Sequence, residues 1–259
     1  MSLIFISLLI LIAVFAPLIV KYDPLEQNLT DRLLPPSKKY IFGTDDLGRD
    51  VFSRVVYGTK ISLSVGIIAV GISTVIGIML GLAAGFFGKT IDTVIMRFVD
   101  ICLCFPTFFL LLMVIAFLEP NIYNVMIVIG ITSWPSITRL IRGEVLSIRE
   151  RDFILAAKIN GISTLRILFV HILPNTIGPI LVNATLGIGG AILTESALSF
   201  LGLGVQPPIP SWGNILTIGK DYIHLAWWLS LFPGLAIFFT VLFFNLLGEG
   251  LRDIFDPKY

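Results

Sequence analysis

Long apolar runs that carry no or few charged residues alternate with short polar segments along this 259-residue chain. A helix needs about 20 apolar residues to cross the hydrocarbon core of a bilayer. Six runs approach or exceed that length: Ser2–Val20, Ile61–Gly88, Ile101–Leu118, Pro120–Thr138, Ile172–Thr194 and Leu225–Gly248. Lipid cannot satisfy free backbone N–H and C=O groups, and no strand-like alternation is present, so helix is the expected spanning form. The pattern predicts an all-α, polytopic membrane protein with six transmembrane helices.

Composition agrees with this prediction and excludes other classes. Hydrophobic residues make up 56% of the chain and charged residues only 14%, whereas a soluble domain has about 25% charged residues. The net charge of +1 argues against a nucleic-acid partner. Cys102 and Cys104 point to different faces of a helix, so we expect neither a disulfide nor metal ligands. Only two His residues occur, which disfavours a membrane-embedded enzyme and a metal site.

The ends of the chain and its polar loops suggest an orientation and a division. The first run precedes any Lys or Arg and has Pro17 after its small-residue pattern, so we interpret it as a retained helix rather than a signal peptide. Lys and Arg are slightly more frequent on the side that holds both termini, which favours cytoplasmic termini. Residues 1–60 are expected to form the first helix and an ordered external loop, and residues 61–259 a five-helix core. The segment Leu201–Ile223, with Trp212, is expected to fold back into the membrane or to form a docking face.

Residues 151–175 interrupt the apolar pattern with a charged segment of small residues. We expect a helix from Arg151 to Lys158 that ends at Asn160-Gly161, because Gly accepts the left-handed conformation of a C-cap. Ser163 or Thr164 is expected to cap a second short helix. The apolar face of that helix is expected to consist of Leu165, Leu168, Phe169 and Ile172. An amphipathic helix on the lipid surface would explain the charges, but the Ala156-Ala157 pair and the Gly turn favour a flat surface for docking a partner.

Three further patterns lie within or beside the spans. Gly77, Gly81 and Gly85 form a stripe that we expect to pack closely against another helix. Small and polar residues in the fifth span suit a path for a polar solute, with Asn183, Gly187 and Glu195 as candidate lining residues. Glu195 has the alternative of accepting hydrogen bonds from N–H groups nearby. Arg97 and Asp100 are three residues apart and are expected to pair along one helix.

The stretch "AAGFFGKT", Ala83–Thr90, fits a relaxed phosphate-binding loop. Such a loop requires a preceding strand and a following helix. Here a transmembrane run precedes it, so we interpret the match as accidental and expect ATP to be bound by another chain.

The segment "LAAKINGISTLRILFVHILP", Leu155–Pro174, resembles the EAA loop of inner-membrane permeases in binding-protein-dependent ABC importers. Leu155 stands where the family motif has Glu. Four further stretches are similar to the C-type subunit of dipeptide, oligopeptide and nickel permeases: "GTDDLGRDVFSRVVYGTKISL" (43–63), "DTVIMRFVDICLCFP" (92–106), "TESALSFLGLGVQPPIPSWG" (194–213) and "FNLLGEGLRDIFDP" (244–257). The resemblance implies a type I importer fold and a cytoplasmic ATPase-coupling loop at about 142–175. The loop residues that it implies are Asp152, Phe153, Ala156, Ala157, Gly161, Ser163, Arg166, His171 and Pro174.

The same resemblance implies the function and the partners. The chain is expected to be a non-catalytic permease that moves small peptides by alternating access. Nickel, a metal-metallophore complex or glutathione remain alternative cargoes, and a secondary transporter is a remote alternative. No cofactor is expected on this chain, because ATP and magnesium would be held by two ATP-hydrolysing subunits. A second, different permease, an extracytoplasmic substrate-binding protein and the lipid of a prokaryotic inner membrane complete the expected surroundings.

Overall fold

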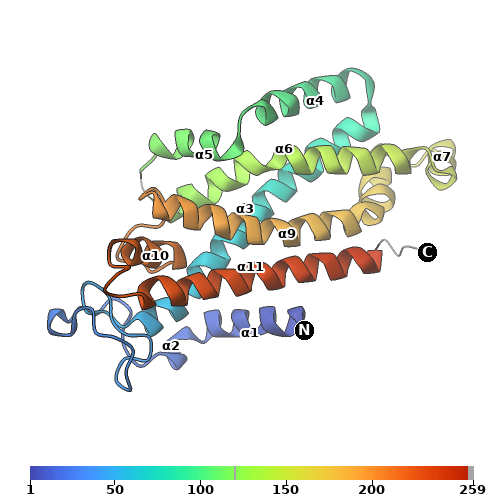
Figure 1. Cartoon of the computed structure of the whole chain (residues 1–259). Coiled ribbons are helices and arrows are strands. Elements are labelled where there is room, and N and C mark those ends of the chain that lie inside the picture. The colour runs from blue at the N-terminus through green and yellow to red at the C-terminus, as the bar shows by residue number, and fades with distance from the viewer. Residues whose placement is uncertain (120, 256–259) are drawn as a thin grey trace.

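A computed structural model describes residues 1–119 and 121–255, so the predicted span start at Pro120 and the motif end at Pro257 lie outside the described residues. Its elements are α1 (Ser2–Val14), α2 (Ala16–Ile19), a 3-10 turn (Leu29–Asp31), α3 (Val51–Phe87), α4 (Lys89–Cys104), α5 (Thr107–Ala116), α6 (Ile122–Arg149), α7 (Asp152–Ile159), α8 (Thr164–Arg166), a π-helical segment (Ile167–Ile172), α9 (Leu173–Phe200), α10 (Trp212–Asp221) and α11 (Trp228–Phe255). The long helices lie lengthwise in one bundle (Figure 1). The prediction of an all-α membrane fold is confirmed.

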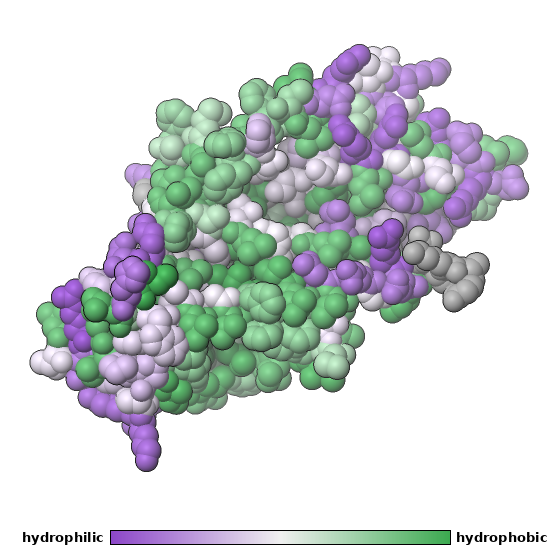
Figure 2. Space-filling view, in the orientation of Figure 1, coloured by the Kyte–Doolittle hydropathy of each residue, from purple (hydrophilic) through white to green (hydrophobic). Residues whose placement is uncertain are grey.

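Four helical segments are long and apolar enough to cross a membrane: α3, α6, the continuous stretch Thr164–Phe200, and α11. Helices α4 and α5 meet the same test together, as one span broken by a bend of 83°. Helix α1 is apolar but has only 13 residues. The described residues therefore give four or five spans by length and composition, and the count of six stays a prediction. Apolar side chains cover the middle of the bundle and polar ones gather at its two ends (Figure 2).

The third predicted span is not a continuous helix. Helix α4 begins at Lys89, ends at Cys104, and is followed by Phe105 in an extended conformation and then by Pro106. A residue before proline is pushed out of the helical region, and proline lacks the N–H that would continue the helix. The expected straight helix Ile101–Leu118 is therefore wrong, and the chain turns at Pro106 to start α5.

Helix α3 begins ten residues before the apolar run that predicted it. The Asp50 carboxylate accepts hydrogen bonds from the Ser53 N–H at 2.8 Å and from its hydroxyl at 2.6 Å, which caps the first turn. The helix ends at Phe87 and is followed by Gly88, whose φ of +63° suits glycine. Gly77, Gly81 and Gly85 face Ile137, Ile141 and Val145 of α6. The stripe thus packs one helix closely against another, as predicted.

The end of the bundle that holds α10 carries an ordered loop. The Trp228 indole N–H donates to the Thr44 carbonyl at 3.0 Å, and the Arg32 guanidinium donates to the Tyr222 hydroxyl at 2.9 Å. Trp212 is fully buried and its indole N–H donates to the Val55 carbonyl at 3.0 Å. The segment with Trp212 therefore packs into the bundle and does not present this tryptophan as a docking face. The end of α11 and α7 lie at the opposite end, whereas α1 starts part of the way along the bundle, with Phe5 stacked on Phe243 near the middle of α11 (Figure 1).

Candidate functional site

Helix α7 ends in a tight turn at Gly161. The Gly161 N–H donates to the Lys158 carbonyl and the Ile162 N–H donates to the Ala157 carbonyl, both at 3.1 Å. This pair of bonds is the Schellman arrangement of a helix C-terminus, and it requires a left-handed residue after the cap. Gly161 supplies it with φ +70°. The predicted helix end and its glycine turn are therefore confirmed.

The two adjacent alanines lie on different faces of α7. Ala157 is buried against the bundle, whereas Ala156 is exposed. Successive residues on an α-helix are rotated by about 100°, so neighbours cannot share one narrow face. The expectation of one flat patch made by both alanines is wrong: one alanine allows α7 to approach the bundle, and the other faces away from it.

The second short helix of the loop is instead the beginning of α9. Thr164–Arg166, the π-helical segment Ile167–Ile172 and α9 form one continuous helical stretch up to Phe200. Its buried residues here are Ile167, Leu168 and Ile172, while Leu165 and Phe169 are exposed. A π turn holds more residues than an α turn and rotates the faces that follow, so the apolar face predicted from α-helical spacing is wrong in part. Ser163 occupies the N-cap position without a capping bond from its side chain.

Three contacts that sequence reasoning missed hold α7 and the end of α6, to which Arg149 belongs, against the bundle. Ile154 is fully buried in a cluster with Ile148 of α6 and with Ile167. The Arg149 guanidinium donates to the Gly85 carbonyl at the end of α3, at 2.9 Å. The Lys158 ammonium lies 5.3 Å from the centroid of the Phe86 ring. The loop is thereby attached to the ends of both α3 and α6. The only signal in the sequence was the three-residue spacing of Ile154 and Ala157, which places both on one buried face of α7.

The remaining surface of the loop is exposed and partly apolar. Ile159 is 86% exposed and Leu165 is 69% exposed, at an end of the molecule where polar side chains dominate (Figure 2). Large exposed apolar residues with a polar surround mark an interaction surface. Of the predicted loop residues, Ala157 is buried, His171 is half-buried, and the others are exposed: Asp152, Phe153, Ala156, Gly161, Ser163, Arg166 and Pro174.

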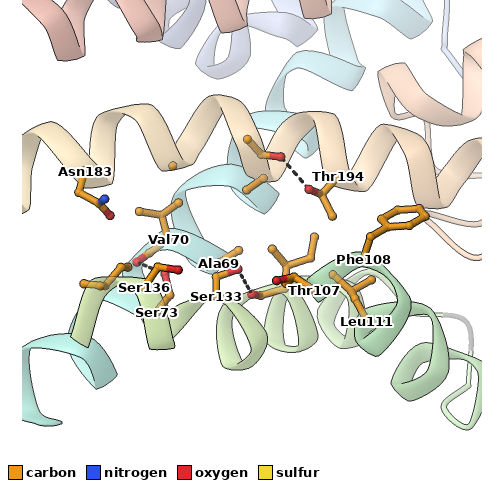
Figure 3. Close-up of a pocket in the computed structure, with 15 residues that line it drawn as sticks. Ala69, Val70, Ser73, Thr107, Phe108, Leu111, Ser133, Ser136, Asn183 and Thr194 are labelled. Atoms are coloured by element: carbon orange, nitrogen blue, oxygen red, sulfur yellow. Dashed lines mark hydrogen bonds between the residues drawn. The ribbon is translucent and has the colours of Figure 1, made fainter. Parts of the chain in front are cut away.

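A cavity of about 390 Å³ lies between α3, α5, α6 and α9 (Figure 3). Its polar lining consists of uncharged groups: Ser73, Thr107, Ser133, Ser136, Asn183 and Thr194. The hydroxyls of Ser73, Ser133 and Thr194 donate to carbonyls of their own helices at 2.7–3.0 Å, so their oxygens remain able to accept hydrogen bonds. Such a lining offers hydrogen bonds to a polar solute without a fixed charge.

Two of the three candidate path residues line this cavity. Asn183 points into it from α9, and Gly187 lies one turn further along (Figure 3). Glu195 does not line it, because its side chain is fully buried between α9 and α10. There one carboxylate oxygen, Oε1, accepts from the Ser199 hydroxyl at 2.7 Å and from the Ser211 hydroxyl at 3.0 Å. Its partners are therefore hydroxyls rather than the N–H groups that the sequence suggested.

The charges of α4 bind α6 rather than each other. Asp92 accepts both the Nε and Nη2 hydrogen bonds of Arg142, at 3.0 and 2.5 Å, and Asp100 accepts from Arg139 at 2.8 Å. The predicted pair of Arg97 with Asp100 is wrong, since Asp100 turns toward the neighbouring helix. Two ion pairs thus connect α4, the first half of the broken span, to α6.

The stretch Ala83–Thr90 has a helical context and not that of a phosphate-binding loop. Its first half is the last turn of α3, Gly88 makes the turn, and α4 starts at Lys89. Gly85 is occupied in packing, with Val145 against it. The strand that a phosphate-binding loop requires does not precede these residues.

Comparison with known proteins gives consistent matches. A family model described as the binding-protein-dependent transport system inner membrane component matches residues 77–259, and one described as the N-terminal TM domain of oligopeptide transport permease C matches residues 1–36. The chain is 49% identical, over 257 residues, to the dipeptide transport system permease protein DppC of Alkalihalophilus pseudofirmus, which covers 99% of this chain and 84% of that protein. It is 40% identical to the oligopeptide transport system permease protein OppC of Bacillus subtilis, with the same coverage. A solved structure of the inward-facing MetNI methionine ABC transporter shares the fold, with a TM-score of 0.62 at 16% identity over 79% of this chain and 97% of that chain.

Proposed function

The chain belongs to the family of inner-membrane components of binding-protein-dependent transport systems and is a permease subunit of an ABC importer, and from this premise we propose that its cargo is a dipeptide or a short oligopeptide. The relatives described above are named for dipeptide and oligopeptide transport, which favours peptides over nickel, a metallophore complex or glutathione. The cavity supports the same choice. Its lining of hydroxyls, one amide and apolar groups suits a hydrated peptide, and the described residues that line it include no carboxylate, imidazole or thiol that would bind nickel.

Helix α7 is the joint to an ATP-hydrolysing partner. The observation that carries this proposal is that the loop has an exposed apolar surface and is also attached to the bundle. A short helix with exposed Ile159, followed by exposed Leu165, stands at the polar end of the bundle. It is attached to α6 through Ile154 and to α3 through Lys158, which lies over the Phe86 ring. A partner that binds ATP and magnesium and moves α7 would therefore move α3 and α6 with it. Both helices line the cavity, so such a movement would open it alternately to the two sides of the membrane.

The arrangement of the ends supports the expected partners and orientation. The end of α11 lies with α7, at the end that we assign to the cytoplasm of a prokaryotic cell, and α1 starts on the side of the bundle nearer to it (Figure 1). The loop of residues 21–50 and α10 then face outward, where a substrate-binding protein would deliver its cargo. A second, different permease subunit would complete the path beside this chain.

The proposal is tested by uptake of a labelled dipeptide into proteoliposomes that contain the full transporter. Gly161→Val should abolish most ATP-dependent uptake, since a β-branched residue is a strained occupant of φ +70°. No atom lies within 4 Å of the position of an added Cβ, so the strain falls on the turn rather than on packing. Gly161→Asn is the matched control, because Asn tolerates the left-handed region, and it should retain most uptake.

Normal ATP-dependent uptake by Gly161→Val would refute the role of α7 as a joint. Uptake that is driven by an ion gradient and is indifferent to ATP would indicate a secondary transporter instead. Uptake of nickel, and not of the dipeptide, by the wild-type transporter would refute the peptide cargo while leaving the joint intact.

A further inference from the structure

A second cavity, of about 530 Å³, lies at the end of the bundle opposite α7. Its walls are formed by α2 and the residues that follow it, the third turn of α3 and the segment before α10. It is separate from the cavity between α3, α5, α6 and α9, with which it shares no lining residue. Its lining includes two lysines, Lys21 and Lys60, and two tyrosines, Tyr22 and Tyr57. This group lies beside α2 and outside the cavity proposed for the cargo.

The two lysines lack carboxylate partners within the part of the chain that the structure describes. The Lys21 ammonium lies 5.3 Å from the centroid of the Tyr22 ring, and both lysines are exposed. Asp23 also lines the cavity, but it forms no ion pair with either lysine; its Oδ1 accepts from the Leu25 N–H at 2.8 Å. The lining therefore holds two ammonium groups against one carboxylate, and it is suited to an anion.

The position of both lysines coincides with the edge of the membrane. Lys21 is the first charged residue after the apolar run Ser2–Val20, and Lys60 is the last one before the charge-free run Ile61–Gly88. The end of the first apolar run and the beginning of the second thus both lie at the wall of this cavity. Lysine and tyrosine at such a boundary lie at the level of the lipid headgroups.

We propose that this cavity binds the phosphate of an anionic phospholipid in the leaflet on the side opposite α7. Lys21 and Lys60 would hold the phosphate, and the Tyr57 hydroxyl is a donor at the same level, whereas the Tyr22 hydroxyl donates to the Lys39 carbonyl at 3.4 Å. A lipid is favoured over a free phosphate because apolar surface continues beside the charged group. Leu18 is 81% exposed and Ile209 is 40% exposed, and both offer contact to acyl chains. The inference stands apart from the peptide cargo, since it needs only that the chain spans a membrane.

The test is a lipid titration of the full transporter in neutral maltoside detergent, followed by native mass spectrometry. Three probes are compared: dioctanoyl phosphatidylglycerol, dioctanoyl phosphatidylcholine and inorganic phosphate. One phosphatidylglycerol per chain should be retained, and the double variant Lys21→Gln/Lys60→Gln should bind it about thirtyfold more weakly, if each basic residue contributes about 1 kcal/mol. Lys21→Arg/Lys60→Arg, which keeps both charges, should bind it nearly as well as the wild type.

Lys38→Gln is the matched control, because Lys38 is exposed on the same loop but does not line the cavity. It should leave retention unchanged, and an equal loss there would overturn the proposal in favour of a general surface charge. Equal retention of phosphatidylcholine, or unchanged binding by the Gln double variant, would also overturn it. Displacement of the lipid by millimolar inorganic phosphate would assign the cavity to a soluble anion. Loss of a protein subunit, rather than of lipid, from the Gln double variant would assign it to a protein interface.

Discussion

Gly77, Gly81 and Gly85 of α3 pack against α6 along a line that we call the glycine seam. Adding a single methyl group at Gly81 is expected to force the two helices apart. A Cβ at this position would lie 2.7 Å from Cβ of Ile141, 2.9 Å from its Cγ2 and 3.0 Å from the Thr138 carbonyl oxygen. Carbon atoms in van der Waals contact are about 3.5–4.0 Å apart. The neighbouring atoms belong to a β-branched side chain and to the backbone of α6, which cannot move aside by a change of rotamer. The two helices would have to separate by about 1 Å.

Gly71→Ala is the matched control for this perturbation. Gly71 lies in the same helix, and no atom lies within 4 Å of the position of its added Cβ. Replacement of Gly by Ala favours a helix by up to about 1 kcal/mol at either position. The difference between the two variants therefore isolates the steric cost, which we expect to be about 1–3 kcal/mol for overpacking at a rigid site.

The assay is reversible unfolding of the full-length chain in mixed dodecyl maltoside and SDS micelles, followed by tryptophan fluorescence. Gly81→Ala should unfold at a lower SDS fraction than the wild type, and Gly71→Ala at an equal or higher one. If the two variants unfold together, the glycine stripe does not set the separation of α3 and α6, and the packing argument is refuted.

Three further predictions concern buried and surface charges. Glu195→Ala should lower the free energy of unfolding by about 1–3 kcal/mol, because two buried serine hydroxyls lose their acceptor; Glu195→Gln, which keeps an acceptor oxygen, should cost less in the same SDS titration. A double-mutant cycle of Asp92→Asn and Arg142→Gln should give a coupling of about 0.5–1 kcal/mol, since the pair is partly exposed, and zero coupling would contradict the interhelical pair. The Lys39 ammonium, through its hydrogen bond, holds the pKa of Asp31 below its ordinary value of 3.8. The ionised Asp31 carboxylate therefore stabilises the fold above about pH 4, and this stabilisation is lost as the pH falls through the lower pKa of the folded state. A titration of unfolding stability against acid should show this loss in the wild type and not in Asp31→Asn.

Much of the fold follows from the length of apolar runs. The runs at 61–88, 120–138, 172–194 and 225–248 each lie largely within one long helix. Their bounds were less predictable, because an apolar run marks the membrane and not the helix. Helix α3 starts at its Asp50 cap, outside the apolar run, and α6 continues past its run to Arg149. The bend at Pro106 was signalled by the proline itself, since proline both removes a donor and restricts the preceding residue.

The sequence predicted the local structure of the candidate site, but not the contacts that its residues make with other helices. Gly161 ends α7 as a left-handed residue, which the sequence alone required. The split of Ala156 and Ala157 between two faces depends on where α7 packs, and the pairing of Asp100 with Arg139 depends on a helix 39 residues away. Spacing along one helix made Arg97 the nearer partner, but lateral packing of α4 on α6 offered a better one. Contacts of this kind are set by the assembled bundle.

The glycine seam and the anchoring of α7 have a joint mechanical consequence. Arg149 holds the end of α3, Ile154 packs against the end of α6, and the glycines keep these two helices in contact along their length. A force on α7 therefore acts on α3 and α6 as one rigid unit, because close-packed cores transmit strain rather than absorb it. Helix α5 lines the same cavity but is joined to α4 only through the bend at Phe105-Pro106. We therefore expect the cavity to change shape chiefly between α5 and the α3–α6 unit. Thr107 and Ser133 both line the cavity, and a crosslink between Thr107→Cys and Ser133→Cys should block uptake without preventing ATP hydrolysis. A crosslink between α3 and α6 within the glycine seam should leave uptake intact. If only the crosslink in the seam blocks uptake, the moving boundary lies elsewhere.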